Sequence, residues 1–279
     1  MGGHFPGPGM PPVLPALSGV KATVAIASGK GGVGKSTVSV NLAVALAQTG
    51  AATGLLDADI YGPSIPMMMG ISRLPQSNGE KILPLEAHGV RLMSLGFLMP
   101  DSAPVIWRGP MVSGAIQQFL QEVDWGALDY LLIDLPPGTG DAQLTLAQSI
   151  PLTGAVIVMT PQDLAMHIAS KALAMFRQLK VPILGILENM STFVCPHCGT
   201  PSAIFRQGGA RRASEQLQIP FLGEIPLHPV VCQTGDRGEP ILTTQPDSPV
   251  ADAFRRVAGA LAERIREEMA SAPVIRMAQ

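Results

Sequence analysis

The stretch "ASGKGGVGKST", from Ala27 to Thr37, decides the fold class. Its spacing Gly-x4-Gly-Lys-Ser, from Gly29 to Ser36, is that of a phosphate loop between a strand and a helix. The apolar run "ATVAIAS" before it predicts a buried strand, and "STVSVNLAVALAQTG" after it has helical spacing that stops at Gly50. Glycines let successive backbone N–H groups turn toward phosphate oxygens, and the helix N-terminus adds positive potential. We therefore expect a phosphate-binding domain.

The side chains around this loop predict metal-assisted phosphoryl chemistry. Lys35 is placed to reach the β- and γ-phosphates, and the Ser36 hydroxyl to coordinate Mg²⁺. A nucleotide hydrolase also needs an acid at the end of another apolar strand to hold Mg²⁺ through water, and Asp134 in "YLLIDLPPG" has that position. Asp57 and Asp59 end a third strand, where one of them could position the attacking water; a helix or turn cap is the alternative for Asp57. The expected nucleotide-binding residues of the loop are Gly29, Lys30, Gly31, Gly32, Val33, Gly34, Lys35, Ser36 and Thr37.

The rest of the chain alternates apolar strands with helices, which predicts a single α/β domain with a mostly parallel sheet flanked by helices on both faces. We expect a flexible Gly/Pro-rich leader over 1–20, the domain over 21–270 and a tail over 271–279. Residues 60–89 look irregular. Further strands are expected at 53–59, 90–96, 130–134, 155–162, 181–190 and 220–226, and helices at 113–123, 164–179, 210–218 and 249–269.

Composition excludes several classes of partner. The net charge is −2 and only 14% of residues are charged, so nothing favours nucleic acid or anionic lipid. Aromatic residues make up 4% of the chain, too few for base-stacking platforms. No apolar run approaches the ~18 residues of a membrane span, and no signal peptide pattern is present. We therefore expect a cytoplasmic protein with no nucleic-acid or membrane partner.

Two of the three cysteines, Cys195 and Cys198, form a CxxC in "VCPHCG". Structural zinc and [4Fe–4S] clusters both usually take four ligands, and one CxxC supplies two. A two-fold dimer would complete the set with a second copy. Zinc held in one chain with His197 or Cys232, and a thioredoxin-like redox pair, remain open alternatives at this point. Cys232 itself is expected to be a small apolar packing residue.

The motifs "KGGVGKST", "DADIYGPS", "WRGPM", "DLPPGTGD", "ENMS" and "CPHCG" occur in this order. Together they closely resemble the Mrp/ApbC family of iron–sulfur carrier ATPases, which belongs to the deviant phosphate-loop class of the MinD and ParA ATPases. The resemblance runs from about Lys21 to the C-terminal helix. Unlike many relatives, this sequence shows no extra N-terminal domain or cysteine-rich extension, only the Gly/Pro leader.

The resemblance implies specific roles for residues whose chemistry the spacing leaves open. Lys30 matches the lysine that crosses a dimer interface and touches the partner's nucleotide. Asp59 matches the switch I aspartate that orients water, and Asp134 the switch II aspartate. Asn189 in "LENM" matches the asparagine that reads adenine. The strands that precede Lys35 and end at Asp134 are implied to be neighbours.

The implied function is a homodimeric ATPase that uses ATP and Mg²⁺ and carries a labile iron–sulfur cluster, expected to be [4Fe–4S]. Cys195 and Cys198 of two subunits would bridge the cluster, which passes between scaffold proteins and apo-proteins. Two rivals remain: a zinc-bridged ATPase scaffold, and a MinD/ParA-like positioning ATPase. Membrane-binding relatives of the second kind use a basic amphipathic C-terminal helix. Here that helix has four basic and four acidic residues, which suits packing on the protein's own sheet.

Overall fold

The computed structural model describes residues 17, 19–60, 62–98, 109–162, 165–195 and 198–271. The expected tail beyond 271, almost all of the expected leader, and Trp107 and Arg108 of "WRGPM" lie outside this part. So does His197, the alternative zinc ligand.

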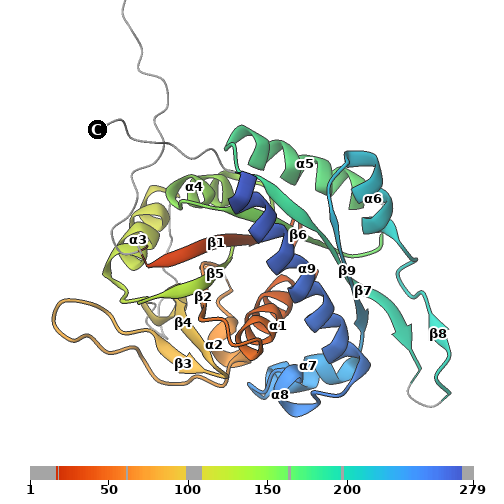
Figure 1. Cartoon of the computed structure of the whole chain (residues 1–279), viewed down its shortest axis with the longest axis horizontal. Helices are drawn as coiled ribbons and strands as arrows, with labels where there is room; N and C mark the ends of the chain where they lie inside the picture. Colours follow the sequence, from red (N-terminus) through yellow and green to blue (C-terminus); the bar gives the residue numbers. More distant parts are fainter. Residues whose placement is uncertain are drawn as a thin grey trace, which may run out of the picture.

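Strands and helices alternate along most of the chain (Figure 1). The strands are β1 (Val20–Ala27), β2 (Thr53–Asp57), β3 (Leu85–Ala87), β4 (Val90–Ser94), β5 (Leu128–Asp134), β6 (Gly154–Met159), β7 (Ile183–Val194), β8 (Pro201–Ser202) and β9 (Phe221–Leu227). The helices are α1 (Lys35–Gln48), α2 (Ile65–Met68), the 3₁₀ turn η2 (Leu95–Leu98), α3 (Gly109–Glu122), α4 (Asp141–Ser149), α5 (Ala165–Gln178), α6 (Gly209–Leu217), α7 (Pro229–Asp236), α8 (Ile241–Thr244) and α9 (Pro249–Ser271).

These strands join into one sheet in the order β3-β4-β2-β5-β1-β6-β7-β8, with β9 also paired to β7. Every pairing is parallel except β3 with β4 and β7 with β8. β1 lies in the middle, and its register sets Ile26 opposite Asp134 of β5. The predicted mostly parallel sheet is confirmed, and the strands that lead to Lys35 and Asp134 are neighbours. The carboxyl ends of these strands therefore bring the phosphate loop and the acidic residues to one edge.

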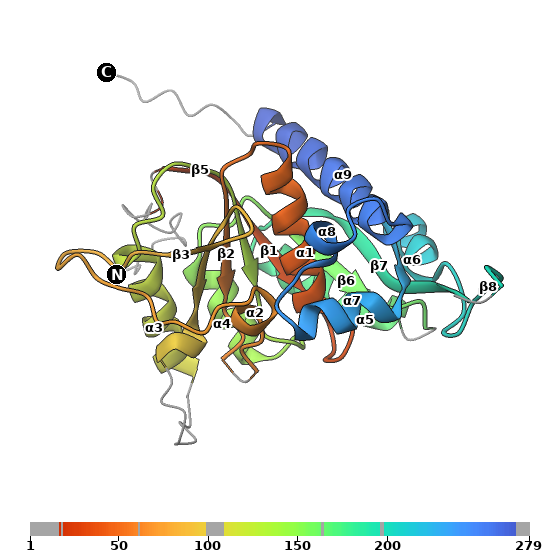
Figure 2. The ribbon, with the colours of Figure 1, turned by 90° about the horizontal axis from the view of Figure 1, so that it is seen from below.

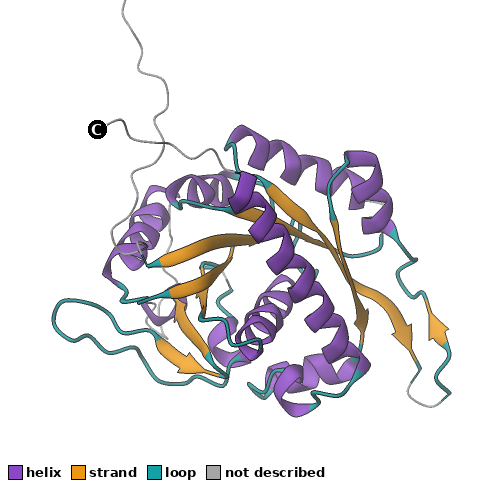
Figure 3. Cartoon of the chain, in the orientation of Figure 1, coloured by secondary structure: helices purple, strands orange, loops and turns teal. Residues whose placement is uncertain are grey.

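Helices cover both faces of the sheet (Figures 2 and 3). Buried apolar side chains of α1 and α9 pack with one face. Those of α3, α4 and α5 pack with the opposite face, and α6 joins α5 there. Because both faces are covered, β6 beside β1 consists of six buried apolar residues in succession.

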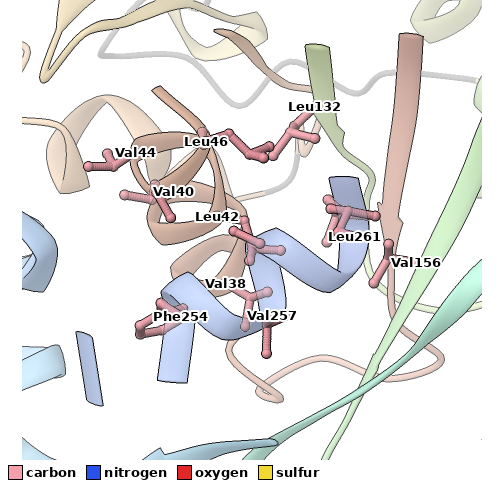
Figure 4. Close-up of a cluster of buried hydrophobic side chains, with 14 of the residues drawn as sticks. Val38, Val40, Leu42, Val44, Leu46, Leu132, Val156, Phe254, Val257 and Leu261 are labelled. Atoms are coloured by element: carbon pink, nitrogen blue, oxygen red, sulfur yellow. The ribbon is translucent and has the colours of Figure 1, made fainter. Parts of the chain in front are cut away.

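The C-terminal helix α9 lies across α1 and turns its apolar face inward (Figure 4). Its residues Val250, Phe254, Val257, Leu261 and Ile265 are each at most 2% exposed. The prediction that this helix packs on the protein's own domain is confirmed. Among the described residues, no helix combines the length and the hydrophobicity that crossing a bilayer requires.

Several short elements differ from the sequence prediction. Residues 60–89 contain α2 and β3, and three further helices, α4, α7 and α8, were not predicted. Each of these helices has fewer than ten residues, too short for apolar periodicity to show. The local signals were present all the same: Pro229 starts α7 at a position that suits proline, and the Nδ1 atom of His228 accepts the Val230 N–H as a cap.

Candidate functional site

The phosphate loop leads from β1 into α1 and is held from outside by β7. The Asn189 amide Nδ2 donates a hydrogen bond to the Val33 carbonyl, at 2.8 Å. Gly34 has φ of 77°, and a Cβ atom there would lie 2.4 Å from Asn189 Nδ2. Only glycine suits Gly34, because the conformation is left-handed and the space is already filled. Asn189 thus lies against the loop, a contact that the adenine-reading role implied by the resemblance does not include.

Asp134, at the end of β5, is the centre of the polar cluster under the loop. It is fully buried and accepts hydrogen bonds from Lys35 Nζ at 2.7 Å, Ser36 Oγ at 2.6 Å and Ser39 Oγ at 2.6 Å. The structure therefore brings together Lys35, Ser36 and Asp134, as the sequence predicts. A hydroxyl and a carboxylate oxygen this close make a donor set that Mg²⁺ prefers. Ser39 was missed, although it lies one helical turn after Lys35 as a buried polar residue in an apolar run.

Asp57 is the last residue of β2 and Asp59 lies two residues beyond it, and the two carboxylates have different surroundings. Asp57 Oδ1 accepts the Asp59 N–H at 3.1 Å, and Asp57 Oδ2 accepts the Ile65 N–H at 3.3 Å and the Ser94 hydroxyl at 3.1 Å. Asp59 Oδ2 instead lies 4.0 Å from Lys35 Nζ. Asp57 therefore shapes the turn, in agreement with the cap alternative, and Asp59 faces the lysine of the phosphate loop.

The Asp57 carboxyl makes stability depend on pH. Burial, followed by the nearby Asp134 charge, raises its pKa to about 7. The folded state therefore binds more protons than the unfolded state between about pH 4 and pH 7. The resulting stabilisation is complete below about pH 4 and is lost as the pH rises toward 7. We expect the free energy of unfolding of the nucleotide-free protein, measured in urea, to fall as the pH rises from about 4 to 7. Asp57→Asn should reduce this dependence on pH.

Asp129 provides a control, because its pKa is shifted in the opposite direction from that of Asp57. Its pKa is lowered by the hydrogen bond from Lys21 Nζ, at 2.7 Å on the surface. Asp129→Asn should remove only a small stabilisation, one that is present at neutral pH and lost in acid. A slope between pH 4 and pH 7 that survives Asp57→Asn would show that Asp57 does not cause it.

Lys30 has a different partner from Lys35 in the single chain. Its Nζ donates to Gln162 Oε1 at 2.5 Å, just beyond β6. Gln162 was not singled out from the sequence. The contact fixes the second lysine at the mouth of the loop, on the side of β6.

A cavity of about 300 Å³ adjoins the phosphate loop at Thr37 and Asn189. One wall comes from α2, a second from the end of β9 with Pro226 and Leu227, and a third from α7. Most of its lining side chains are apolar. Of these residues only Thr37, from the motif, and Asn189, from the resemblance, were expected in the nucleotide site. The other walls come from elements that approach the loop only in the folded chain.

The CxxC motif lies in a hairpin that β7 and β8 extend beyond the body of the protein (Figure 1). The Cys195 N–H donates to the Thr200 carbonyl at 3.1 Å, and the Gly199 N–H donates back to the Cys195 carbonyl at 2.9 Å. Cys198 is exposed, with its Sγ 3.2 Å from Thr200 Oγ1. Hydrogen bonding from Thr200 and then Cys195 lowers the pKa of the Cys198 thiol. The thiolate of Cys198, the form that binds metal, is therefore more accessible than that of an unperturbed cysteine.

The expectation for Cys232 was wrong. This residue is exposed on α7 and lines the cavity instead of packing in the core. The Asp236 carboxylate, whose Oδ2 is 3.7 Å from the sulfur, raises the pKa of its thiol. Among the described residues, no group of three or more His, Cys, Asp and Glu side chains is arranged to hold a metal ion. Cys232 thus does not complete a metal site with Cys195 and Cys198.

The fold and the loop define a phosphate-loop NTPase of the ParA type. Residues 19–262 match the family model of the NUBPL iron-transfer P-loop NTPases. The chain belongs to this family, in agreement with the resemblance of its motifs.

Individual relatives agree with this assignment. The iron-sulfur cluster carrier protein of Synechocystis is 53% identical over 254 residues, covering 88% of this chain and 71% of the relative. The iron-sulfur cluster transfer protein NUBPL of Mus musculus is 47% identical over 261 residues, covering 92% and 82%. The solved nucleotide-binding protein of Archaeoglobus fulgidus, in complex with ADP, superposes with a TM-score of 0.75 at 40% identity, covering 86% and 94%.

Proposed function

We propose that this chain is an ATP-hydrolysing carrier of iron–sulfur clusters that works as a homodimer. The observation that carries the proposal is the course of β7. At Asn189 this strand touches the phosphate loop, and it ends at Val194, next to the exposed CxxC. A nucleotide site and a pair of thiols are thus built on one strand. The names of the relatives from Synechocystis and Mus musculus support a carrier role.

In the nucleotide half, backbone N–H groups of the loop bind the phosphates together with Lys35. Ser36 and Asp134 would hold Mg²⁺, Asp134 through water, and the ion would supply charge neutralisation on the phosphate oxygens. Asp59 orients the attacking water, since its carboxylate lies 4.0 Å from Lys35 Nζ, the group that binds the phosphates. The cavity beside Thr37 and Asn189 takes the nucleobase, and Asn189 contributes its amide there.

In the cluster half, Cys195 and Cys198 supply two thiolates. A [4Fe–4S] cluster is held by four. A two-fold axis beside the hairpin supplies the second pair from another copy of the same chain. Because the hairpin extends from the body, the bridged cluster stays exposed enough to be received from a scaffold protein and delivered to an apo-protein.

Lys30 links the nucleotide to the dimer. In the single chain Gln162 holds it. On dimerisation we propose that Lys30 leaves Gln162 and reaches the nucleotide of the partner subunit, where a phosphate is a stronger acceptor for an ammonium than a neutral amide. Hydrolysis would then require two copies.

Mixing two inactive variants tests this composite site. Lys30→Ala and Asp59→Ala should each hydrolyse ATP poorly. In their heterodimer, one site keeps its own Asp59 and receives the intact Lys30 from the other chain. Mixing should therefore restore part of the phosphate release, up to one working site per heterodimer.

The control mixes two variants that each damage the site of their own chain. Asp59→Ala mixed with Asp134→Asn should restore nothing, because each site of that heterodimer lacks one of its own carboxylates. Activity that is independent of protein concentration, or no recovery in the first mixture, would remove the role of Lys30 in the partner's site.

The function as a whole is tested by transfer. Protein reconstituted with iron and sulfide without oxygen should convert an apo-protein that accepts a [4Fe–4S] cluster, and the rate should change with Mg-ATP. The Lys35→Ala variant should transfer without a nucleotide effect. Protein that holds zinc in place of iron after purification, or that cannot convert the acceptor, would contradict the carrier role.

A further inference from the structure

The methionine segment "PMMMG", from Pro66 to Gly70, has no role in the site as described so far. Its last methionine, Met69, is 1% exposed and belongs to the core, but Met67 is 57% exposed. Both Met67 and Met68, on α2, line the cavity that begins at Thr37 and Asn189. Two flexible apolar side chains therefore face a space next to the phosphate loop.

The segment is held at both ends, so its methionines are presented in a fixed place. At its start the Ile65 N–H donates to Asp57 Oδ2, at 3.3 Å. At its end Gly70 is pressed against Gly238, where a Cβ added to Gly238 would lie 2.4 Å from the Gly70 Cα. This contact joins α2 to the segment after α7, and α7 forms another wall of the same cavity (Figure 2).

We propose that Met67 and Met68 form the apolar surface on which the base of the bound nucleotide packs. This inference rests on the nucleotide part of the proposed function. Thioether side chains are polarizable and adapt their shape, and they make favourable contacts with aromatic rings. They carry no strong hydrogen-bonding group, so they strengthen binding of any purine. Discrimination among bases falls to polar neighbours such as Asn189.

The test compares two ligands that share phosphates but differ in the base. Nucleotide-free protein is titrated with Mg-ATP and with Mg-tripolyphosphate. Met67→Ala and Met68→Ala should each weaken ATP binding about 5- to 10-fold, which corresponds to roughly 1 kcal/mol for the lost apolar contact. Tripolyphosphate binding should not change. Met68→Leu should restore most of the ATP affinity, because it keeps the volume.

Leu74→Ala is the matched control. Leu74 is also an exposed apolar residue, at 67%, but it does not line the cavity. Leu74→Ala should change the affinity for neither Mg-ATP nor Mg-tripolyphosphate. An equal loss of tripolyphosphate affinity in the methionine variants, or unchanged ATP affinity, would overturn the proposal.

Cys232 lets the base be located independently. In a Cys195→Ser and Cys198→Ser background it is the single remaining thiol of the chain, and it lines the same cavity. Saturating Mg-ATP should slow its alkylation by iodoacetamide, and saturating Mg-tripolyphosphate should not. Tight ATP binding without protection would overturn the methionine surface and leave the ATPase standing. If neither ligand binds, the proposed function fails, and the inference fails with it.

Discussion

Replacing Lys35 with alanine should abolish ATP binding and destabilise the nucleotide-free protein at the same time. Its ammonium lies 2.7 Å from the fully buried Asp134 carboxylate and 4.0 Å from that of Asp59. Without Lys35 the β- and γ-phosphates lose their main counter-charge, so we expect at least a 100-fold loss of ATP affinity by calorimetry. Breaking a buried ion pair from one side costs about 3–5 kcal/mol, which urea unfolding measures.

Lys21→Ala is the control for Lys35→Ala, because it also removes a lysine that pairs with an aspartate. Lys21 also pairs with an aspartate at 2.7 Å, but its side chain is 71% exposed. Exposed pairs contribute about 0–1 kcal/mol, so the control should keep both its stability and its ATP affinity. A Lys35→Ala protein that binds ATP like the parent would contradict the assignment of the phosphate loop.

Cys195→Ser and Cys198→Ser should each remove the iron–sulfur cluster completely. Reconstituted parent protein should contain about four iron per dimer, as a cluster held by four thiolates requires, and should be coloured. Either change halves the thiolates available to a symmetric dimer. ATP binding should survive, because the phosphate loop is built from other residues. Iron analysis, the visible spectrum and calorimetry measure the three outcomes.

Cys232→Ser is the matched control and should keep iron and colour, because Asp236 raises the pKa of this thiol and Cys232 forms no metal-binding group with Cys195 and Cys198. A chelator should strip the iron without lowering the unfolding midpoint, since the hairpin lies outside the core. Iron that disappears only in Cys232→Ser would contradict the bridged site, as would zinc that no chelator removes.

Much of this fold could be predicted because the deciding signals are local in sequence. The phosphate loop spacing, the continuous apolar strands and the long amphipathic helix α9 each occupy one segment, and the structure has them where expected. The short helices α2, α4, α7 and α8 were missed, since a helix of one or two turns depends on its tertiary contacts more than on its own periodicity.

The site was predictable only where the motif itself held the residues. Lys35, Ser36 and Asp134 come together as expected. Three other features depend on residues far apart in the chain. They are the contact of Asn189 with Val33, the contact of Lys30 with Gln162, and the methionine side chains that line the cavity. The exposure of Cys232 was missed for a related reason: a lone cysteine carries no periodic signal of which side of a helix it occupies.

The central position of β1 has a consequence during synthesis. Its partners β5 and β6 are encoded far downstream. Ile26 can pair with Asp134, and Val24 with Gly154, only after those strands have been synthesised. At about 5–20 residues per second, a ribosome needs on the order of ten seconds to add them. The nascent chain therefore carries the whole phosphate-loop sequence long before the loop has the walls that shape it. Nucleotide cannot assist folding until β5 and β6 have emerged, and a chain cut before Gly154 should have no site at all.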